Sequence, residues 1–196
     1  LALSNLVARA APRFSFATVL IAGVVFVAAG GLDWILAWVY VGAVAVLYVV
    51  NISLLLRKNP EVLEERLSAE KGAEKWDRLL TSTATSIAAA SYIVAGLDNR
   101  FAWTQEVSPA MPVSGLVLFA VGGALFSWAM SVNKFFAKFV RIQKERGQFA
   151  VTEGPYRYVR HPGYVGWVLM ANAAALILGS WWALIPSLIS IVLSRV

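Results

Sequence analysis

Apolar stretches that are long enough to cross a lipid bilayer follow one another along this chain of 196 residues. A helix needs roughly 20 apolar residues to span the hydrocarbon core, and a backbone inside that core must satisfy its own hydrogen bonds. The sequence therefore predicts an all-α fold, an integral membrane helical bundle with about six transmembrane helices. The six stretches cover residues 14–30, 34–56, 79–97, 113–132, 162–178 and 181–193.

The composition favours a single membrane domain. Hydrophobic residues make up 59% of the chain, charged residues make up 14%, and the mean hydropathy is +0.69. These values exclude an ordinary water-soluble domain. We expect residues 1–196 to form one domain, in which residues 1–133 make a four-span bundle and residues 134–196 make a loop and a final helical hairpin.

The positive charges predict how the chain is oriented in the membrane. Of the 17 Lys and Arg residues, 13 lie in the polar loops 57–80 and 134–160, and only Arg100 lies on the opposite side of the predicted bundle. Because cytoplasmic loops are rich in Lys and Arg, both loops and both termini are predicted to be cytoplasmic. The weakly apolar segment 79–97 must then cross the membrane. This distribution also explains the net charge without nucleic-acid binding.

Two residue counts limit the chemistry that the chain can perform. It contains no cysteine and a single histidine, His161. Disulfides, thiolate nucleophiles and metal sites built from histidine or cysteine are therefore excluded, and no metal site is predicted. The sequence does not define an oligomeric state.

The loop 57–80 is predicted to contain an amphipathic helix that begins at Pro60. Its apolar anchors are expected to be Leu63, Leu67 and Trp76. Its charged residues either gate a site or form a solvated face with internal ion pairs, and we favour the solvated face. These residues are Glu61, Glu64, Glu65 and Arg66.

Two smaller patterns carry structural predictions. The phenylalanines Phe135, Phe136 and Phe139 are interleaved with basic residues. They could contact lipid head groups or a substrate tail, but we favour a plain helix at the membrane interface. Asn51 and Asn172 fall inside predicted spans, where polar side chains commonly hydrogen-bond between helices. We expect both asparagines to bridge helices rather than to contact a ligand.

The densest group of polar and aromatic residues is the run GPYRYVRHPGYVGW, residues 154–167. Pro162 is suited to the first turn of a helix, whose positive end would lie beside Arg160 and His161 and could hold a carboxylate. The hydroxyls and ring faces of Tyr156, Tyr158 and Tyr164 could also contact a cation. The alternative is that these residues only anchor the chain at the membrane surface.

This run resembles the signature G-x-Y-x-x-x-R-H-P-x-Y-x-G of the isoprenylcysteine carboxyl methyltransferase family and its bacterial relatives. The resemblance continues upstream through residues 140–154 and, more loosely, to residues 59–67. The fixed positions of the signature are Gly154, Tyr156, Arg160, His161, Pro162, Tyr164 and Gly166.

The resemblance implies a membrane methyltransferase that uses S-adenosylmethionine and releases S-adenosylhomocysteine, with the cofactor bound by the loop of residues 134–160 and the final hairpin. Arg160 would orient the acceptor and act as the catalytic residue. The residues that would contact the cofactor are Gln148, Val151, Gly154, Tyr156, His161, Pro162 and Tyr164. Gln148 stands where the family frequently has histidine, and Gln143 is a further candidate. His161 is thus expected to line the cofactor pocket rather than to act as a general base.

The implied acceptor is a lipid-like carboxylate, such as that of a prenylated cysteine, delivered from the bilayer. A carboxylate is already ionised at neutral pH and needs no strong base. A phospholipid amine or another small lipid is an alternative acceptor. Two other classes of protein also stay open, a nicotinamide-dependent membrane reductase of the sterol-reductase type and a non-enzymatic membrane scaffold.

Overall fold

A computed structural model of the chain describes residues 3–67, 75–137 and 146–193. Every regular element in these ranges is helical, which confirms the predicted all-α membrane bundle. The elements are α1 (Leu3–Ala29), α2 (Ile35–Lys58), α3 (Pro60–Leu67), α4 (Lys75–Phe101), α5 (Ala110–Val132), the 3-10 helix η2 (Gly154–Arg157), α6 (Pro162–Ile177) and α7 (Leu184–Leu193).

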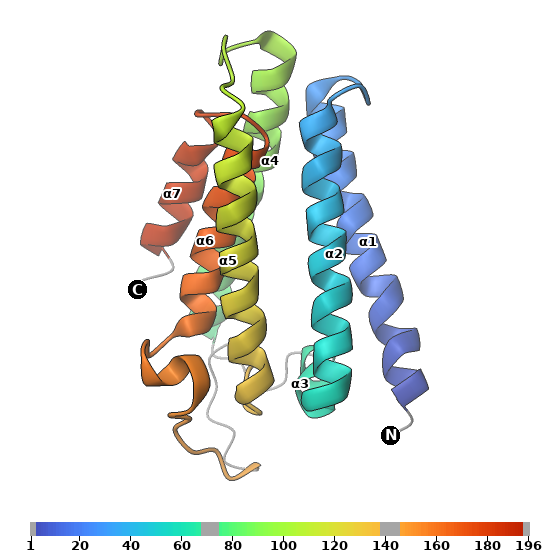
Figure 1. Cartoon of the computed structure of the whole chain (residues 1–196), viewed down its shortest axis with the longest axis vertical. Helices are drawn as coiled ribbons and strands as arrows, with labels where there is room; N and C mark the ends of the chain where they lie inside the picture. Colours follow the sequence, from blue (N-terminus) through green and yellow to red (C-terminus); the bar gives the residue numbers. More distant parts are fainter. Residues whose placement is uncertain (1–2, 68–74, 138–145, 194–196) are drawn as a thin grey trace.

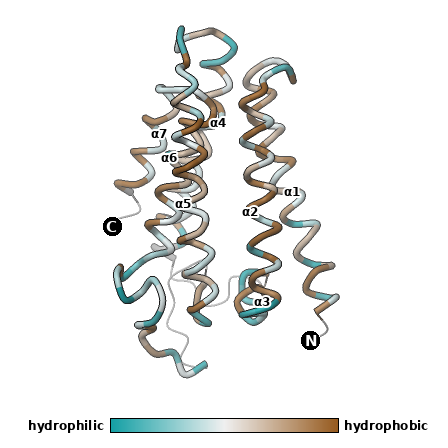
Figure 2. Tube along the Cα trace, viewed as in Figure 1, coloured by the Kyte–Doolittle hydropathy of each residue, from teal (hydrophilic) through white to brown (hydrophobic). Residues whose placement is uncertain are grey.

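The long helices run side by side along the longest axis of the molecule (Figure 1). α1 and α2 form one hairpin, α5 packs most extensively against α6, and α4 lies against both α1 and α7. Hydrophilic residues gather at the two ends of the bundle, whereas the helices are mostly apolar along their length (Figure 2). This is the pattern that a bilayer selects.

Four helices are long and apolar enough to cross a membrane: Leu3–Ala29, Ile35–Lys58, Arg78–Phe101 and Ala110–Val132. The third includes the weakly apolar segment whose crossing the charge distribution required. At about 1.5 Å per residue it is longer than the hydrocarbon core, which is roughly 30 Å thick.

The last two of the six predicted spans form shorter apolar helices. α6 has 16 residues, and α7 has 10 within the described range. α6 begins at Pro162, which lacks a backbone N–H, and it ends before Gly179, whose φ of +69° is left-handed. The amides of Gly179 and Ser180 donate to the carbonyls of Leu176 and Ala175, a Schellman ending that stops the helix.

The two basic regions lie at the same end of the bundle. α3, the turn after α5 and the segment that contains η2 are all found at the end where α1 begins (Figure 1). Arg100 lies near the end of α4 at the opposite end. The fold thus has both basic regions at one end of the bundle and Arg100 at the other, as the charges predicted. The assignment of the basic end to the cytoplasm stays a prediction.

Candidate functional site

The predicted site begins at a glycine that fits tightly against α5. Gly154 has a φ of +56°, a left-handed conformation that strongly favours glycine. A Cβ atom at this position would lie 2.9 Å from Cγ2 of Val132 and 3.1 Å from Nε1 of Trp128. Any other residue would be strained and would push η2 away from the last turns of α5.

Tyr156 fixes the next part of the site to the end of α5. The side-chain amide of Asn133 donates a hydrogen bond to the Tyr156 hydroxyl, with an N–O distance of 3.0 Å. The ring is half-buried, and burial raises the pKa of Tyr156, although the bond from Asn133 acts in the opposite direction. The hydroxyl is therefore neutral at physiological pH and acts as a hydrogen-bonding anchor.

The side chains around the start of α6 are open to the surroundings. His161 precedes the first helical residue, and its ring meets the ring of Tyr164 edge-on at a centroid distance of 5.9 Å. Arg160 and His161 are exposed, as are Tyr158 (78%) and Tyr164 (49%). The residues on either side of the α6 amino terminus thus include exposed aromatic rings and the exposed guanidinium of Arg160.

Beneath this exposed face, α6 is held very close to its neighbours. A Cβ atom on Gly166 would lie 2.7 Å from the carbonyl oxygen of Gly122 on α5, so the two backbones are in direct contact. A Cβ atom on Gly163 would lie 2.7 Å from the ring of Phe136. Pro162 is buried beside it. Gly163 and Gly166 therefore position the start of α6, whereas Arg160, His161 and Tyr164 are exposed.

The remaining predicted cofactor residues lie before η2. Gln148 is exposed and Val151 is half-buried in the segment that leads from Arg146 to Gly154. Gln143 lies outside the described residues. The structure brings His161 and Tyr164 into contact, but the assignment of these seven residues to a cofactor and of Arg160 to the acceptor stays a prediction.

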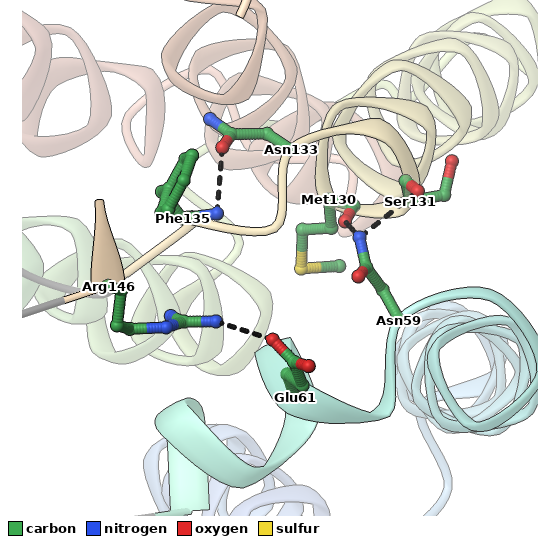
Figure 3. Close-up of polar contacts among 7 residues, drawn as sticks. All are labelled: Asn59, Glu61, Met130, Ser131, Asn133, Phe135 and Arg146. Atoms are coloured by element: carbon green, nitrogen blue, oxygen red, sulfur yellow. Dashed lines mark hydrogen bonds and ion pairs between the residues drawn. The ribbon is translucent and has the colours of Figure 1, made fainter. Parts of the chain in front are cut away.

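Sequence reasoning missed the contacts that tie α3 to this region (Figure 3). The side-chain amide of Asn59 donates to the carbonyls of Met130 and Ser131, at 3.4 and 3.2 Å. Glu61 forms an ion pair with Arg146 at 2.9 Å. Pro60 marked a helix start directly after Asn59, but this local signal does not indicate the contact with α5. The Glu61 partner is 85 residues away and follows only from the fold.

Several smaller predictions can now be compared with the structure. Leu63 and Leu67 are buried as expected, whereas the side chain of Trp76 is not among those that the structure describes. Phe135 and Phe136 lie in a turn, so the predicted interfacial helix is wrong for them, and Phe139 is not described. The chain turns here because the side-chain oxygen of Asn133 accepts a hydrogen bond from the backbone N–H of Phe135.

The asparagines inside the bundle behave differently from each other. Asn172 accepts a hydrogen bond from Ser187 of α7 at 3.2 Å, which confirms that it bridges helices. Asn51 donates to the carbonyl of Leu47 on its own helix, and its side-chain oxygen is buried without a partner. The prediction of a bridge is therefore wrong for Asn51 in the described part of the chain.

Comparison with known proteins identifies one similarity. Residues 111–196 match the family described as phospholipid methyltransferase. No curated protein and no solved structure matches the chain. The matched region begins at α5 and includes the whole run 154–167. This family consists of membrane methyltransferases related to the isoprenylcysteine carboxyl methyltransferases, so the part of the chain that carries the candidate site is similar to membrane methyltransferases.

Proposed function

We propose that this protein is an integral membrane methyltransferase that uses S-adenosylmethionine and acts on a lipid acceptor. The observation that carries the proposal is the family match over residues 111–196, which covers the exposed face formed by Arg160, His161 and Tyr164. These residues lie at the end of a bundle whose long helices are apolar enough to span a membrane. A soluble cofactor and a membrane-embedded acceptor can meet at such a boundary.

The chemical groups at the start of α6 would suit S-adenosylmethionine. S-adenosylmethionine carries a carboxylate and a cationic sulfonium, and when bound it supplies an activated methyl group. The amino-terminal turn of α6 favours a carboxylate through its backbone N–H groups and helix dipole. The exposed ring faces of Tyr158 and Tyr164 favour a cation. Gln148, Val151, Gly154, Tyr156, His161 and Pro162 would complete the pocket wall.

The residues of this chain would promote the reaction mainly by positioning. Arg160 carries a planar guanidinium that can orient a carboxylate with two hydrogen bonds while it remains charged. The ring contact between His161 and Tyr164 restricts both side chains at the pocket wall. The close packing of α5 and α6 fixes the backbone from which all of these groups project. Holding two reactants in line accounts for a large part of many rate enhancements.

Two observations bear on the chemical class of the acceptor. The exposed Arg160 supports a carboxylate, such as that of a prenylated cysteine. The description of the matched family supports a phospholipid. We propose a carboxylate as the methyl acceptor, with a phospholipid amine as the second candidate. In either case the acceptor would enter from the bilayer, and the cofactor would enter from the cytoplasm.

Methyl transfer into membrane lipids tests the proposal. Purified protein is incubated with S-adenosylmethionine that is radiolabelled in the methyl group and with membrane extract, and the lipid products are then treated with base. Release of the label as volatile methanol is expected for a carboxyl ester, whereas a base-stable label identifies an N-methylated lipid. No incorporation into lipid, with native protein that binds S-adenosylhomocysteine, would contradict the lipid acceptor.

A further inference from the structure

Arg66 of α3 reaches from its own helix to the end of α5. Its guanidinium carbon lies 5.7 Å from the ring centre of Phe126 and 5.8 Å from that of Phe136. These two rings meet edge-on at a centroid distance of 5.5 Å. The cation is thus held against a pair of aromatic rings inside the bundle end, and the solvated face that the sequence predicted does not describe Arg66.

The guanidinium is partly buried without an acidic partner in the described part of the chain. Burial lowers the pKa of Arg66, and the only group there that opposes this effect is the hydroxyl of Tyr48 on α2. Two other cations at this end have a polar partner: Arg146 pairs with Glu61, and Arg13 donates to the carbonyl of Leu67. Desolvating a cation is costly, and contact with aromatic rings offsets only part of the cost. An anion beside Arg66 would offset the remainder.

The position of Arg66 is fixed by the packing of α3. Val62 and Leu63 are fully buried, and Leu67 is nearly so. Residues three or four positions apart share a helix face, so Arg66 projects from the same side of α3 as Val62 and Leu63, and α3 cannot rotate Arg66 away from the bundle without unpacking them. Its inward orientation therefore follows from the apolar face of the helix.

A single aromatic ring separates Arg66 from the start of α6. The Phe136 ring that contacts the guanidinium is the same ring that a Cβ atom on Gly163 would meet at 2.7 Å. Gly163 is only two residues after His161 and three after Arg160. An anion held at Arg66 would therefore lie close to the Phe136 ring, which itself packs against the start of the helix where the methyl donor is proposed to bind.

We propose that Arg66 binds the anionic group, a phosphate or a carboxylate, of a lipid acceptor. The proposal rests on the methyltransferase function given above, because that function supplies the reason for a lipid head group at this place. Phe126 and Phe136 orient the guanidinium and line the apolar side of the group that it holds. Arg66 thereby acts as a binding residue that is separate from Arg160.

Calorimetric titration of the full chain in a neutral maltoside detergent tests this proposal. The probes are dodecyl phosphate, laurate, dodecanol and inorganic phosphate, so that a lipid-borne anion is distinguished from a free anion and from a neutral tail. A hydrogen bond to a charged group changes affinity by about tenfold or more, and Arg66→Met is expected to weaken binding of an anionic amphiphile by at least that factor. Arg66→Lys is expected to bind with intermediate affinity, since it keeps the charge without the planar fork.

Arg57→Gln is the matched control, because Arg57 is an exposed cation at the same end of the bundle. It is expected to bind the amphiphiles as the native protein does. Unchanged binding in folded Arg66→Met, an equal loss in Arg57→Gln, or binding of dodecanol or inorganic phosphate as tight as that of the amphiphiles would overturn the proposal. If Arg66→Met does not fold, native-like binding by Arg66→Lys and by Arg66→Gln would overturn it.

Titration of the same proteins with S-adenosylhomocysteine separates this site from the proposed function. Arg66→Met is expected to bind S-adenosylhomocysteine as tightly as the native protein does, because Arg66 lies outside the proposed cofactor site. Absence of S-adenosylhomocysteine binding in every protein, with amphiphile binding that still depends on Arg66, would contradict the methyltransferase function while leaving the anion site in place.

Discussion

At the scale of single residues, Arg160 is the most direct test of the proposed chemistry. Arg160→Gln removes the charge and the planar fork, so the rate of methyl transfer is expected to fall about a hundredfold, the typical effect of misplacing a reactant. Affinity for S-adenosylhomocysteine is expected to change little. Arg157→Gln removes an exposed charge three residues earlier and serves as the control. A similar loss in both variants, or none in Arg160→Gln, would argue against an orienting role.

Tyr156 provides a second residue-scale prediction, which concerns stability and pH. Tyr156→Phe removes the acceptor of the Asn133 hydrogen bond, a loss of about 1 kcal/mol in the free energy of unfolding. Because burial raises the pKa of Tyr156 in the folded state, its contribution is complete below about pH 10 and is lost as the pH rises through the folded pKa. Denaturant unfolding followed by tryptophan fluorescence should therefore give a native-to-variant difference that shrinks above this pH. A difference that stays constant at alkaline pH would be inconsistent with the buried hydroxyl.

At the scale of helices, the contact between α5 and α6 is the feature that positions the site. Gly166→Ala places a methyl group against the Gly122 carbonyl and is expected to destabilise the protein by about 1–3 kcal/mol. Gly42→Ala is the matched control, because a Cβ atom there has nothing within 4 Å, and it is expected to be neutral or stabilising by up to about 1 kcal/mol. Thermal unfolding in detergent measures both. Equal stability of the two variants would show that the close helix contact is not formed.

The helices themselves were largely predictable, whereas the contacts between them were not. Apolar runs indicated every long helix, and Pro162 marked where α6 begins, because both signals are local. The bond between Asn133 and Tyr156 joins residues that are 23 positions apart, and no local pattern specifies it. Arg66 is an intermediate case: it stands three residues after the predicted anchor Leu63, but the general preference of charged side chains for solvent led to the prediction of a solvated face.

At the scale of the whole molecule, the charge distribution predicts which end of the bundle is cytoplasmic. The chain has no cysteine, so a single introduced cysteine reports one position. Glu106, in the connection between α4 and α5, and Glu153, directly before η2, are both exposed, and these two segments lie at opposite ends of the bundle (Figure 1). A membrane-impermeant maleimide added to intact cells is expected to label Glu106→Cys and to label Glu153→Cys only after the membrane is opened. The reverse pattern would place the candidate site outside the cytoplasm, away from the cofactor.

The central claim, that the exposed face at the start of α6 serves a methyltransferase, is tested most directly by cofactor binding. Purified protein is titrated in parallel with S-adenosylhomocysteine and with NADPH, and Tyr164→Ala is included because Tyr164 presents an exposed ring on that face. We expect saturable binding of S-adenosylhomocysteine that is weakened in Tyr164→Ala, and no saturable binding of NADPH. Saturable binding of NADPH alone would contradict the methyltransferase and favour a nicotinamide-dependent membrane reductase.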